Sequence, residues 1–202
     1  MLTKYEFLEP LARRRTNEVV VTSMSAVRPW GQLSDHPLDF ASADSAMGHA
    51  ADLALGIALA QPDRRVICLN GDGSMLMSLG TLVTIAQCRA TNLVLLIAQN
   101  DTYEITGNQS IPGAGWIDFA AMARAAGWPH AFIFDSARDY EEQLDQILRL
   151  DGPVAVVVHV APGDEGPMTR GEGEEITYLR TSLAESAHQL RESLALTSLS
   201  PS

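Results

Sequence analysis

A short polar segment, Asn70-Gly71-Asp72-Gly73-Ser74, lies between an apolar stretch and a helical pattern. Its glycines permit a tight turn and a close backbone approach to a ligand, and the amides at the start of the next helix could face an anion such as a phosphate. Asp72 would repel a bare phosphate there. A divalent cation between the two would remove that repulsion, and a carboxylate ligand favours Mg²⁺ or Ca²⁺ over a soft metal. The segment therefore predicts a site for a divalent cation and a phosphate.

A second oxygen ligand is expected from the neighbouring strand. Asn100 follows Asp72 by 28 residues, which is the length of one helix and one returning parallel strand. A right-handed crossover would bring Asn100 beside Asp72 at the same edge of the sheet. The loop Asp101-Thr102-Tyr103 could add a backbone carbonyl as a third ligand. Because Mg²⁺ keeps several oxygens from phosphate and water, two side chains and one carbonyl suffice.

Three other interpretations of the glycine-rich segment compete with a metal site. An ordinary strand-to-helix turn with Asp72 as the helix N-cap stays open, although the spacing to Asn100 weakens it. A dinucleotide-binding fingerprint fails because Leu76 stands where G-x-G-x-x-G needs its third glycine. An EF-hand loop fails because the glycine at position six and the glutamate at position twelve are missing.

Six apolar stretches are predicted to form the sheet that positions these residues. Their continuous apolar character, with helical patterns between them, indicates parallel strands buried on both faces. The expected fold class is α/β, with a doubly wound, about six-stranded parallel sheet and helices on both faces. We expect strands at residues 18–23, 38–42, 65–70, 92–99, 130–135 and 153–160. We expect helices at residues 44–61, 74–88, 116–126, 136–150 and 176–195, the first with an acidic cap at Asp44, and a loop at 100–115.

The domain organisation is expected to be simple. Residues 1–162 are predicted to form one ligand-binding domain, because no composition change or repeat divides them. Residues 163–202 are predicted to form a C-terminal extension that is first rich in Gly, Pro and acidic residues and then carries one amphipathic helix. That helix could pack on a partner, on a second copy of the chain or on its own domain.

Composition narrows the possible partners. The 202 residues carry a formal net charge of −11, which argues against nucleic acid and anionic membrane as partners. Cys68 and Cys88 form neither a C-x-x-C motif nor a disulfide framework, which favours a reducing compartment. The first ten residues lack an apolar signal core, and the apolar runs at 93–98 and 154–158 are too short to cross a bilayer. We therefore expect a soluble, cytoplasmic protein.

The glycine-rich segment and the residues after the next strand resemble a known motif. Gly71-Asp72-Gly73-Ser74, then Asn100, Tyr103 and Thr106-Gly107-Asn108-Gln109, are similar to the thiamine diphosphate and magnesium motif of thiamine-dependent enzymes. The wider resemblance covers roughly residues 17–160. Within it, the chain resembles the separate thiamine-binding subunits, or C-terminal halves, of sulfopyruvate and phosphonopyruvate decarboxylases.

This resemblance implies a set of ligand-binding residues. Mg²⁺ would be held by the Asp72 carboxylate, the Asn100 side chain and the Thr102 carbonyl. The thiamine diphosphate site as a whole would comprise Ser23, Ser25, Ser45, Met47, Gly71, Asp72, Gly73, Ser74, Asn100, Thr102 and Tyr103. Ser23 and Ser25 could equally be turn residues at the end of a strand.

The same resemblance implies Met47 and Ser45 in catalysis, and Glu104 is a further candidate because it departs from the motif. Met47 would hold the two rings of the cofactor in a bent shape, and the Ser45 carbonyl would accept a hydrogen bond from its amino group. The alternative for Met47 is a core methionine on a helix face. Glu104 stands where the motif usually has a small residue, often Gly. Near a substrate it would disfavour a second anion, but we expect it to face solvent, because glutamate is rarely buried.

Other polar residues are given smaller roles. Gln99-Asn100 replaces the two asparagines that the motif often has and keeps the second, ligating one. His49 lies in an Ala- and Leu-rich helical pattern, and we expect it to be packed or hydrogen-bonded rather than to act as an acid or base. The remaining histidines show no spacing that would indicate a zinc site.

The resemblance also implies that half of the active site is missing from this chain. A glutamate from a separate pyrimidine-binding domain should activate the cofactor, and the first 16 residues cannot supply that domain. A separate subunit in an α₂β₂ heterotetramer is therefore expected. The function that follows is the cofactor-binding β subunit of a 2-oxo acid decarboxylase, acting on a small 2-oxo acid. The alternatives are a carboligase subunit, acyloin-forming or transketolase-like, and a non-catalytic assembly partner.

Overall fold

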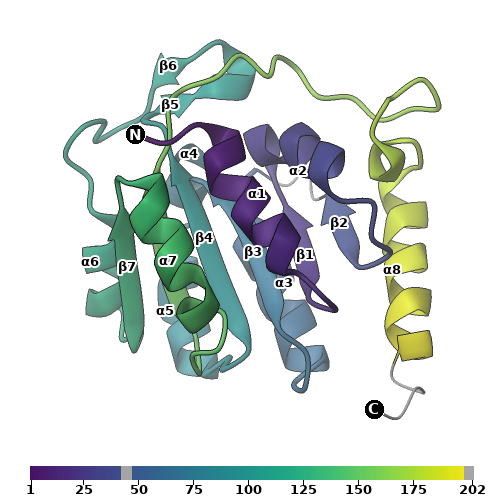
Figure 1. Cartoon of the computed structure of the whole chain (residues 1–202), viewed down its shortest axis with the longest axis horizontal. Coiled ribbons are helices and arrows are strands. Elements are labelled where there is room, and N and C mark those ends of the chain that lie inside the picture. The colour runs from purple at the N-terminus through teal and green to yellow at the C-terminus, as the bar shows by residue number, and fades with distance from the viewer. Residues whose placement is uncertain (42–46, 198–202) are drawn as a thin grey trace.

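A parallel sheet of six strands forms the centre of the computed structural model, which describes residues 1–41 and 47–197 (Figure 1). The strand order is β2-β1-β3-β4-β8-β7, and every neighbouring pair is parallel. The strands are β1 (Val19–Thr22), β2 (Asp39–Ala41), β3 (Val66–Gly71), β4 (Leu93–Gln99), β7 (His130–Phe134) and β8 (Val154–His159). The predicted α/β class, the parallel sheet and its six strands are confirmed.

Helices cover both faces of this sheet. One face packs against α1 (Lys4–Arg14), α2 (Val27–Leu33) and α7 (Ala137–Ile147), and the other against α3 (Ala50–Ala60), α5 (Gly80–Cys88) and α6 (Phe119–Ala125). Successive residues of a strand point to opposite faces, so Val66 and Cys68 of β3 join one hydrophobic cluster while Ile67 and Leu69 join the other. Burial on both faces is the reason why the strand sequences are continuously apolar.

Two predicted helices have different bounds in the structure. The helix expected at 44–61 begins at Ala50, and the proposed cap Asp44 lies outside the described residues. The helix expected at 74–88 is wrong as one element, because it consists of α4 (Asp72–Met77) and α5 with a break at Ser78. Gly48 packs closely against this break: a Cβ on Gly48 would lie 3.0 Å from Met77 Cβ and 3.2 Å from Ser78 Oγ.

The N-terminal helix α1 has no counterpart among the predicted elements. A capping box starts it: the Thr3 hydroxyl accepts the Glu6 N–H at 3.1 Å, and the Glu6 carboxylate accepts the Thr3 N–H at 2.7 Å. Its apolar face buries Phe7, Leu8 and Leu11 in the hydrophobic cluster on its face of the sheet. The helix thereby brings Lys4, in its first turn, to the carboxyl edge of the sheet.

The loop expected at 100–115 contains a small hairpin at that same edge. Strands β5 (Thr102–Tyr103) and β6 (Gln109–Ser110) pair in antiparallel fashion around a single 3₁₀ turn, η2 (Glu104–Thr106). Asp101, which precedes the hairpin, has a φ of 61°. The hairpin stands above the ends of β3 and β4, so it can form a wall of a site there (Figure 1).

The C-terminal helix lies along the edge strand β2. Residues 161–176 cross the carboxyl edge of the sheet, and η3 (Thr177–Leu179) and α8 (Leu183–Thr197) follow, so the helix begins later than the predicted residue 176 (Figure 1). Leu190 is buried in the core, and Arg170 donates to the Ala41 carbonyl of β2. Of the three alternatives for this helix, packing on its own domain is the one that these contacts support, and it covers an otherwise open sheet edge.

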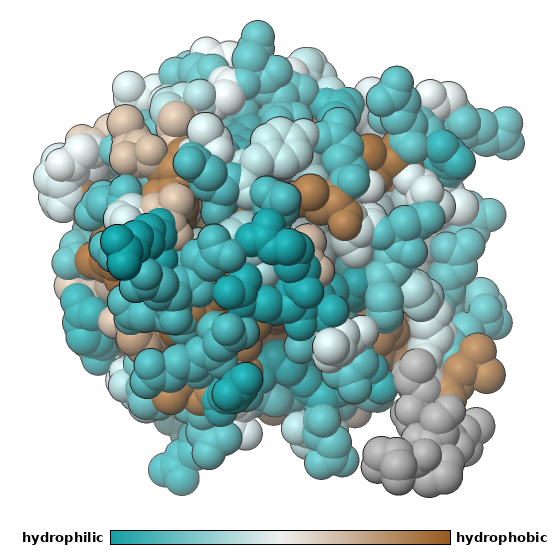
Figure 2. Space-filling model, in the orientation of Figure 1, coloured by the Kyte–Doolittle hydropathy of each residue, from teal (hydrophilic) through white to brown (hydrophobic). Residues whose placement is uncertain are grey.

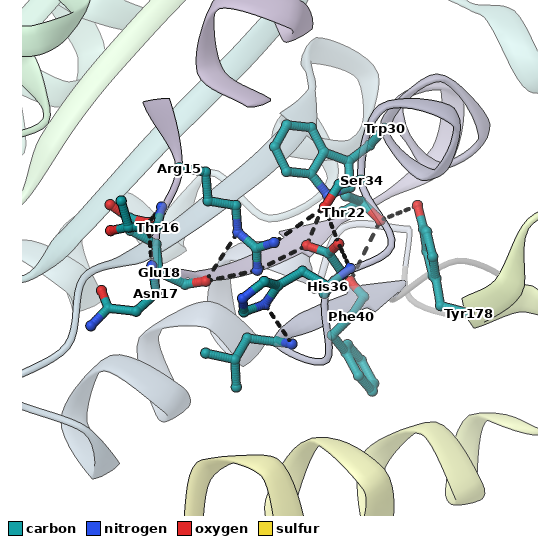
Figure 3. Close-up of polar contacts among 12 residues, drawn as sticks. Arg15, Thr16, Asn17, Glu18, Thr22, Trp30, Ser34, His36, Phe40 and Tyr178 are labelled. Carbon is teal, nitrogen blue, oxygen red and sulfur yellow. Dashed lines mark hydrogen bonds and ion pairs between the residues drawn. The ribbon is translucent and has the colours of Figure 1, made fainter. Parts of the chain in front are cut away.

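A buried ion pair connects the end of α1, helix α2 and the edge strand β2 (Figure 3). Asp39 Oδ1 lies 3.1 Å from the Arg15 guanidinium and accepts Trp30 Nε1 at 3.0 Å, and Asp39 Oδ2 accepts the His36 N–H at 3.1 Å. Both charged side chains are almost fully buried. Because the carboxylate and the guanidinium are paired and hydrogen-bonded, the pair fixes how α2 leaves β1.

His36 in this network should make the stability of the protein depend on pH. Burial, followed by the charge of Arg15, lowers the pKa of His36 below its ordinary value of 6.5, and Arg64 acts in the same direction, while Asp39 and Glu18 oppose it. A lowered pKa in the folded state means that the unfolded chain takes up the proton first, so stability is lost as the pH falls below 6.5.

We expect His36→Asn to reduce this loss. The ring nitrogen Nδ1 accepts the Leu38 N–H at 3.1 Å, a bond that an asparagine oxygen can replace, since Asn bonds readily to its own backbone two residues on. Urea unfolding at pH 7.5 and pH 5.5 gives the comparison. The free energy of unfolding should fall less between the two pH values in the variant, and an equal fall in both proteins would contradict the role of His36.

The surface adds two observations. The face covered by α1 and α7 is mainly hydrophilic, with scattered hydrophobic residues (Figure 2). Among the residues that the structure describes, no helix is long and apolar enough to span a bilayer.

Candidate functional site

A cleft opens at the carboxyl ends of β1, β3 and β4, where open parallel sheets bind ligands. The turn after β1, the start of α4 and the hairpin β5–β6 form its walls. Most of the residues named from the sequence line this one cleft: Ser25, Met47, Gly71, Asp72, Gly73, Ser74, Asn100, Thr102, Tyr103 and Glu104. Ser23 does not line it, and Ser45 lies outside the described residues.

Asp72 is the most buried carboxylate of the cleft, with 2% of its surface exposed. Its Oδ1 accepts the Gly73 N–H at 2.7 Å, and its Oδ2 accepts the N–H groups of Asn100 at 2.9 Å and Asp101 at 2.6 Å. Burial raises the pKa of Asp72 to about 6, although these backbone hydrogen bonds act in the opposite direction. The carboxylate is thus held rigidly in a place where a nearby cation would favour its charged form.

The two strand ends meet as the crossover spacing predicts. Gly71 of β3 pairs with Ala98 of β4, which places Asp72 and Asn100 side by side. Gly71, and not Asp72, is the N-cap of α4, and no side chain caps that helix end. The interpretation of Asp72 as an ordinary helix cap is therefore wrong, since its carboxylate bonds across to the next strand.

Asn100 is held at both ends of its side-chain amide. Its Nδ2 donates to Glu104 Oε2 at 2.8 Å, and its Oδ1 accepts the Thr102 N–H at 3.1 Å. Carboxylate, amide and carbonyl oxygens from Asp72, Asn100 and Thr102 are the ligand types that suit Mg²⁺. Across the described part of the chain, no three His, Cys, Asp or Glu side chains cluster as metal ligands.

The glycines of the segment differ in the space around them. A Cβ on Gly73 would lie 2.7 Å from the Tyr103 ring, so the close contact between α4 and the hairpin requires glycine there. A Cβ on Gly71 would meet no atom within 4 Å and would extend into open space. Gly73 is thus needed by the fold, whereas Gly71 leaves room beside the cleft.

Two residues near α3 also reach this cleft. Met47 lies in the turn before α3, where its half-buried side chain lines the cleft, so the alternative of a core methionine on a helix face is wrong. Ser74 Oγ accepts the Gly48 N–H at 2.9 Å and so fastens this turn to α4. His49 is exposed and pairs with Asp52 at 2.9 Å, outside the cleft.

The two serines after β1 have different surroundings. Ser23 is buried, and its hydroxyl donates to Asn70 Oδ1 at 3.0 Å, which joins the ends of β1 and β3. Ser25 lines the cleft one residue beyond Met24, whose φ is 47°. Of the two, Ser25 is placed to touch a ligand, whereas Ser23 supports the loop as the turn interpretation suggested.

The expectation that Glu104 faces solvent is wrong. Only 4% of the residue is exposed, and its carboxylate pairs with the Lys4 ammonium and accepts Asn100 Nδ2. Burial is possible because Lys4 supplies a compensating charge. Lys4 was missed as a residue of this region because α1 was not predicted; the Thr3–Glu6 capping box was the signal that could have revealed the helix.

Comparisons with known proteins agree with this site. Residues 31–158 match the family model described as thiamine pyrophosphate (TPP) enzyme, C-terminal TPP binding domain. The β subunit of sulfopyruvate decarboxylase from Methanothermobacter thermautotrophicus is 36% identical over 178 residues, which cover 87% of this chain and 92% of that protein. Phosphonopyruvate decarboxylase from Streptomyces viridochromogenes is 36% identical over 149 residues, covering 74% of this chain but 37% of that protein.

A solved structure shows the same fold. The thiamine diphosphate-dependent 4-hydroxybenzoylformate decarboxylase of Rhodococcus jostii superposes with a TM-score of 0.69 at 23% identity, over 81% of this chain and 33% of that one. The chain thus spans nearly all of one relative and about a third of the longer proteins. It belongs to the family of thiamine pyrophosphate enzymes, of which it carries the C-terminal TPP-binding domain.

Proposed function

We propose that this chain is the cofactor-binding β subunit of a two-component, thiamine diphosphate-dependent 2-oxo acid decarboxylase. The observation that carries the proposal is the meeting of Asp72 and Asn100 in one cleft, in a chain that matches nearly the whole length of a sulfopyruvate decarboxylase β subunit. The similarity to phosphonopyruvate decarboxylase supports a small 2-oxo acid with a second acidic group as the substrate class.

The residues of the cleft fit a magnesium diphosphate. Asp72, the Asn100 side-chain oxygen and the Thr102 carbonyl would bind Mg²⁺, and Gly73, Ser74 and Ser25 would contact the diphosphate. When bound, thiamine diphosphate supplies the carbon nucleophile and stores the electron pair released by decarboxylation. This chain would supply charge and position. It buries the Asp72 carboxylate, holds the Asn100 side-chain oxygen by a hydrogen bond and leaves space beside Gly71 for the diphosphate.

Other residues of the cleft would position the organic part of the cofactor. Met47 presents an apolar side chain from the turn before α3, which suits contact with the cofactor rings. The Tyr103 ring closes the opposite wall above Gly73. The Ser45 carbonyl stays a proposed partner of the cofactor amino group.

Several features support a separate pyrimidine-binding subunit. The cleft has a volume of about 90 Å³, whereas pockets for small molecules typically have about 300–1,000 Å³. Its carboxylates, Asp72 and Glu104, are both engaged, so neither is placed to activate the pyrimidine ring. Helices α3 to α5 also expose four large apolar side chains that a partner could cover: Leu53, Leu59, Met77 and Val83. An α₂β₂ assembly satisfies these requirements.

Reconstitution tests this proposal. The chain should release no CO₂ from sulfopyruvate or phosphonopyruvate by itself, and should do so when mixed with the pyrimidine-binding subunit, Mg²⁺ and thiamine diphosphate. Turnover by the chain alone would overturn the need for a partner. A cofactor-loaded assembly that releases no CO₂, or that joins an added acceptor aldehyde to the substrate, would overturn simple decarboxylation in favour of a non-catalytic or carboligase subunit.

A further inference from the structure

Glu104 forms part of a buried charged cluster behind the cleft. Its Oε1 pairs with the Lys4 ammonium and accepts the Glu165 N–H at 3.3 Å, while Glu165 Oε1 lies 3.2 Å from Lys4 Nζ. The side chains of Glu104 and Lys4 are 1% and 10% exposed. Three segments meet in this cluster: the first turn of α1, the hairpin β5–β6 and the irregular segment after β8 (Figure 1).

The other carboxylate oxygen of Glu104 faces the cleft residue Asn100. Oε2 accepts Asn100 Nδ2 at 2.8 Å. An ionised carboxylate only accepts hydrogen bonds, whereas an asparagine amide has a donating end and an accepting end. Glu104 therefore requires the amide to present Nδ2 to it, and Oδ1 must face the other way, toward the Thr102 N–H.

We propose that Glu104 is a positioning residue that fixes the Asn100 side chain with its oxygen available to a divalent cation. This inference rests on the proposed role of Asn100 as a magnesium ligand. Thr102 N–H uses one lone pair of Oδ1 and leaves the second free. Without Glu104 the Thr102 N–H alone favours this orientation, so the amide can more readily rotate by half a turn and present its NH₂ group, which repels a cation.

Lys4 determines whether the side chain of residue 104 has an oxygen left to accept Asn100 Nδ2. The Lys4 ammonium pairs with an oxygen of residue 104. In the wild type, Glu104 Oε1 pairs with Lys4 while Oε2 accepts Asn100 Nδ2. A glutamine has one oxygen, which Lys4 would take, so its NH₂ group would face Asn100 Nδ2. The isosteric Glu104→Gln should therefore turn the Asn100 amide around and disturb the cation site as much as Glu104→Ala does.

This reasoning predicts a rescue that a merely structural role would not give. Replacing the ammonium as well, in the double variant Lys4→Met/Glu104→Gln, frees the glutamine oxygen to accept Asn100 Nδ2. The double variant should bind Mg²⁺ more tightly than Glu104→Gln alone, although it lacks two charges. Glu142→Gln, which removes a carboxylate from an exposed ion pair on α7, is the matched control.

A spectroscopic test needs neither metal nor cofactor. In ¹⁵N-labelled, metal-free full chain, the Asn100 side-chain NH₂ should show a downfield proton that exchanges slowly, because it is bonded to a buried carboxylate. Asn100→Asp identifies the signal. The shift and the protection should be lost in Glu104→Ala and retained in Glu142→Gln. An unchanged Asn100 signal in Glu104→Ala would overturn the proposal.

The second readout is Mg²⁺ affinity, titrated at fixed thiamine diphosphate into the assembly with the pyrimidine-binding subunit. Glu104→Ala and Glu104→Gln should each weaken it on the order of 10–100-fold, as loss of a group that orients a ligand does. Thermal unfolding of each variant confirms that it is folded at the titration temperature. Affinity within about twofold of wild type in both variants would overturn the role of Glu104. If the wild-type assembly showed no Mg²⁺-dependent binding of thiamine diphosphate, the proposed function would be overturned instead. The proposed role of Asn100 as a Mg²⁺ ligand would then be lost as well.

Discussion

Asp72→Asn should abolish the Mg²⁺-dependent binding of thiamine diphosphate while the protein stays folded. Asp72 supplies the one carboxylate among the three proposed Mg²⁺ ligands, and an amide in its place removes the negative charge that a dication needs. The asparagine oxygen can still accept the N–H groups of Asn100 and Asp101, so the junction between α4 and the hairpin survives. We expect the affinity for thiamine diphosphate in the presence of Mg²⁺ to fall by more than about 100-fold. Loss of a group that only orients a metal ligand typically costs about 10–100-fold.

The choice of asparagine matters because Asp72 also supports the fold. Asp72→Ala would leave three N–H groups without their acceptor, at a cost of about 1–3 kcal/mol for each buried one. The matched control is Asp118→Asn, since Asp118 caps α6 by accepting the Ala121 N–H and asparagine caps helices equally well. Calorimetry should show normal binding in the control. Binding in Asp72→Asn within tenfold of wild type would contradict a metal role for Asp72.

Alanine at each of the two glycines of the cleft should have opposite effects on stability and on binding. At position 71 the added methyl meets no protein atom within 4 Å, so Gly71→Ala should leave the melting temperature nearly unchanged but should place a methyl group in space that the diphosphate needs. At position 73 the methyl would lie 2.7 Å from the Tyr103 ring and 3.3 Å from Ile111, so Gly73→Ala should lose about 1–3 kcal/mol of stability by overpacking.

The comparison of these two variants needs both readouts. Differential scanning calorimetry gives the stability of each variant, and titration of thiamine diphosphate into the assembly gives its affinity. We expect Gly71→Ala to be stable but to bind the cofactor at least tenfold more weakly. Tight cofactor binding by a stable Gly71→Ala would show that the diphosphate does not approach the backbone there.

The central sheet was predictable because its sequence signal is local. The strands are short, mainly apolar runs, and the inner strands β1, β3, β4 and β8 are buried on both faces. The spacing from Asp72 to Asn100 fits one crossover connection. The pairing of Gly71 with Ala98 follows from that connection and required no knowledge of distant residues. For this reason, the proximity of the cleft residues that follow β3 and β4 could be predicted from the sequence.

The position of Glu104 was not predictable in the same way. Its partner Lys4 lies 100 residues away in the chain, in the first turn of a helix that was not among the predicted elements. The usual exposure of glutamate therefore led to the prediction that Glu104 faces solvent, whereas the contact with Lys4 allows its burial. The break between α4 and α5 was not predicted either, and it lies where Gly48, from another part of the chain, packs against Ser78.

Whether this chain holds the magnesium and diphosphate half of a shared thiamine site is tested most directly by one calorimetric titration. Thiamine diphosphate is added to the full chain, to the pyrimidine-binding subunit and to their mixture, each with Mg²⁺ and with a chelator. We predict tight binding in the mixture with Mg²⁺, and weak or no binding in every other case. Tight binding to the mixture in the presence of chelator, or no binding to it with Mg²⁺, would contradict that claim.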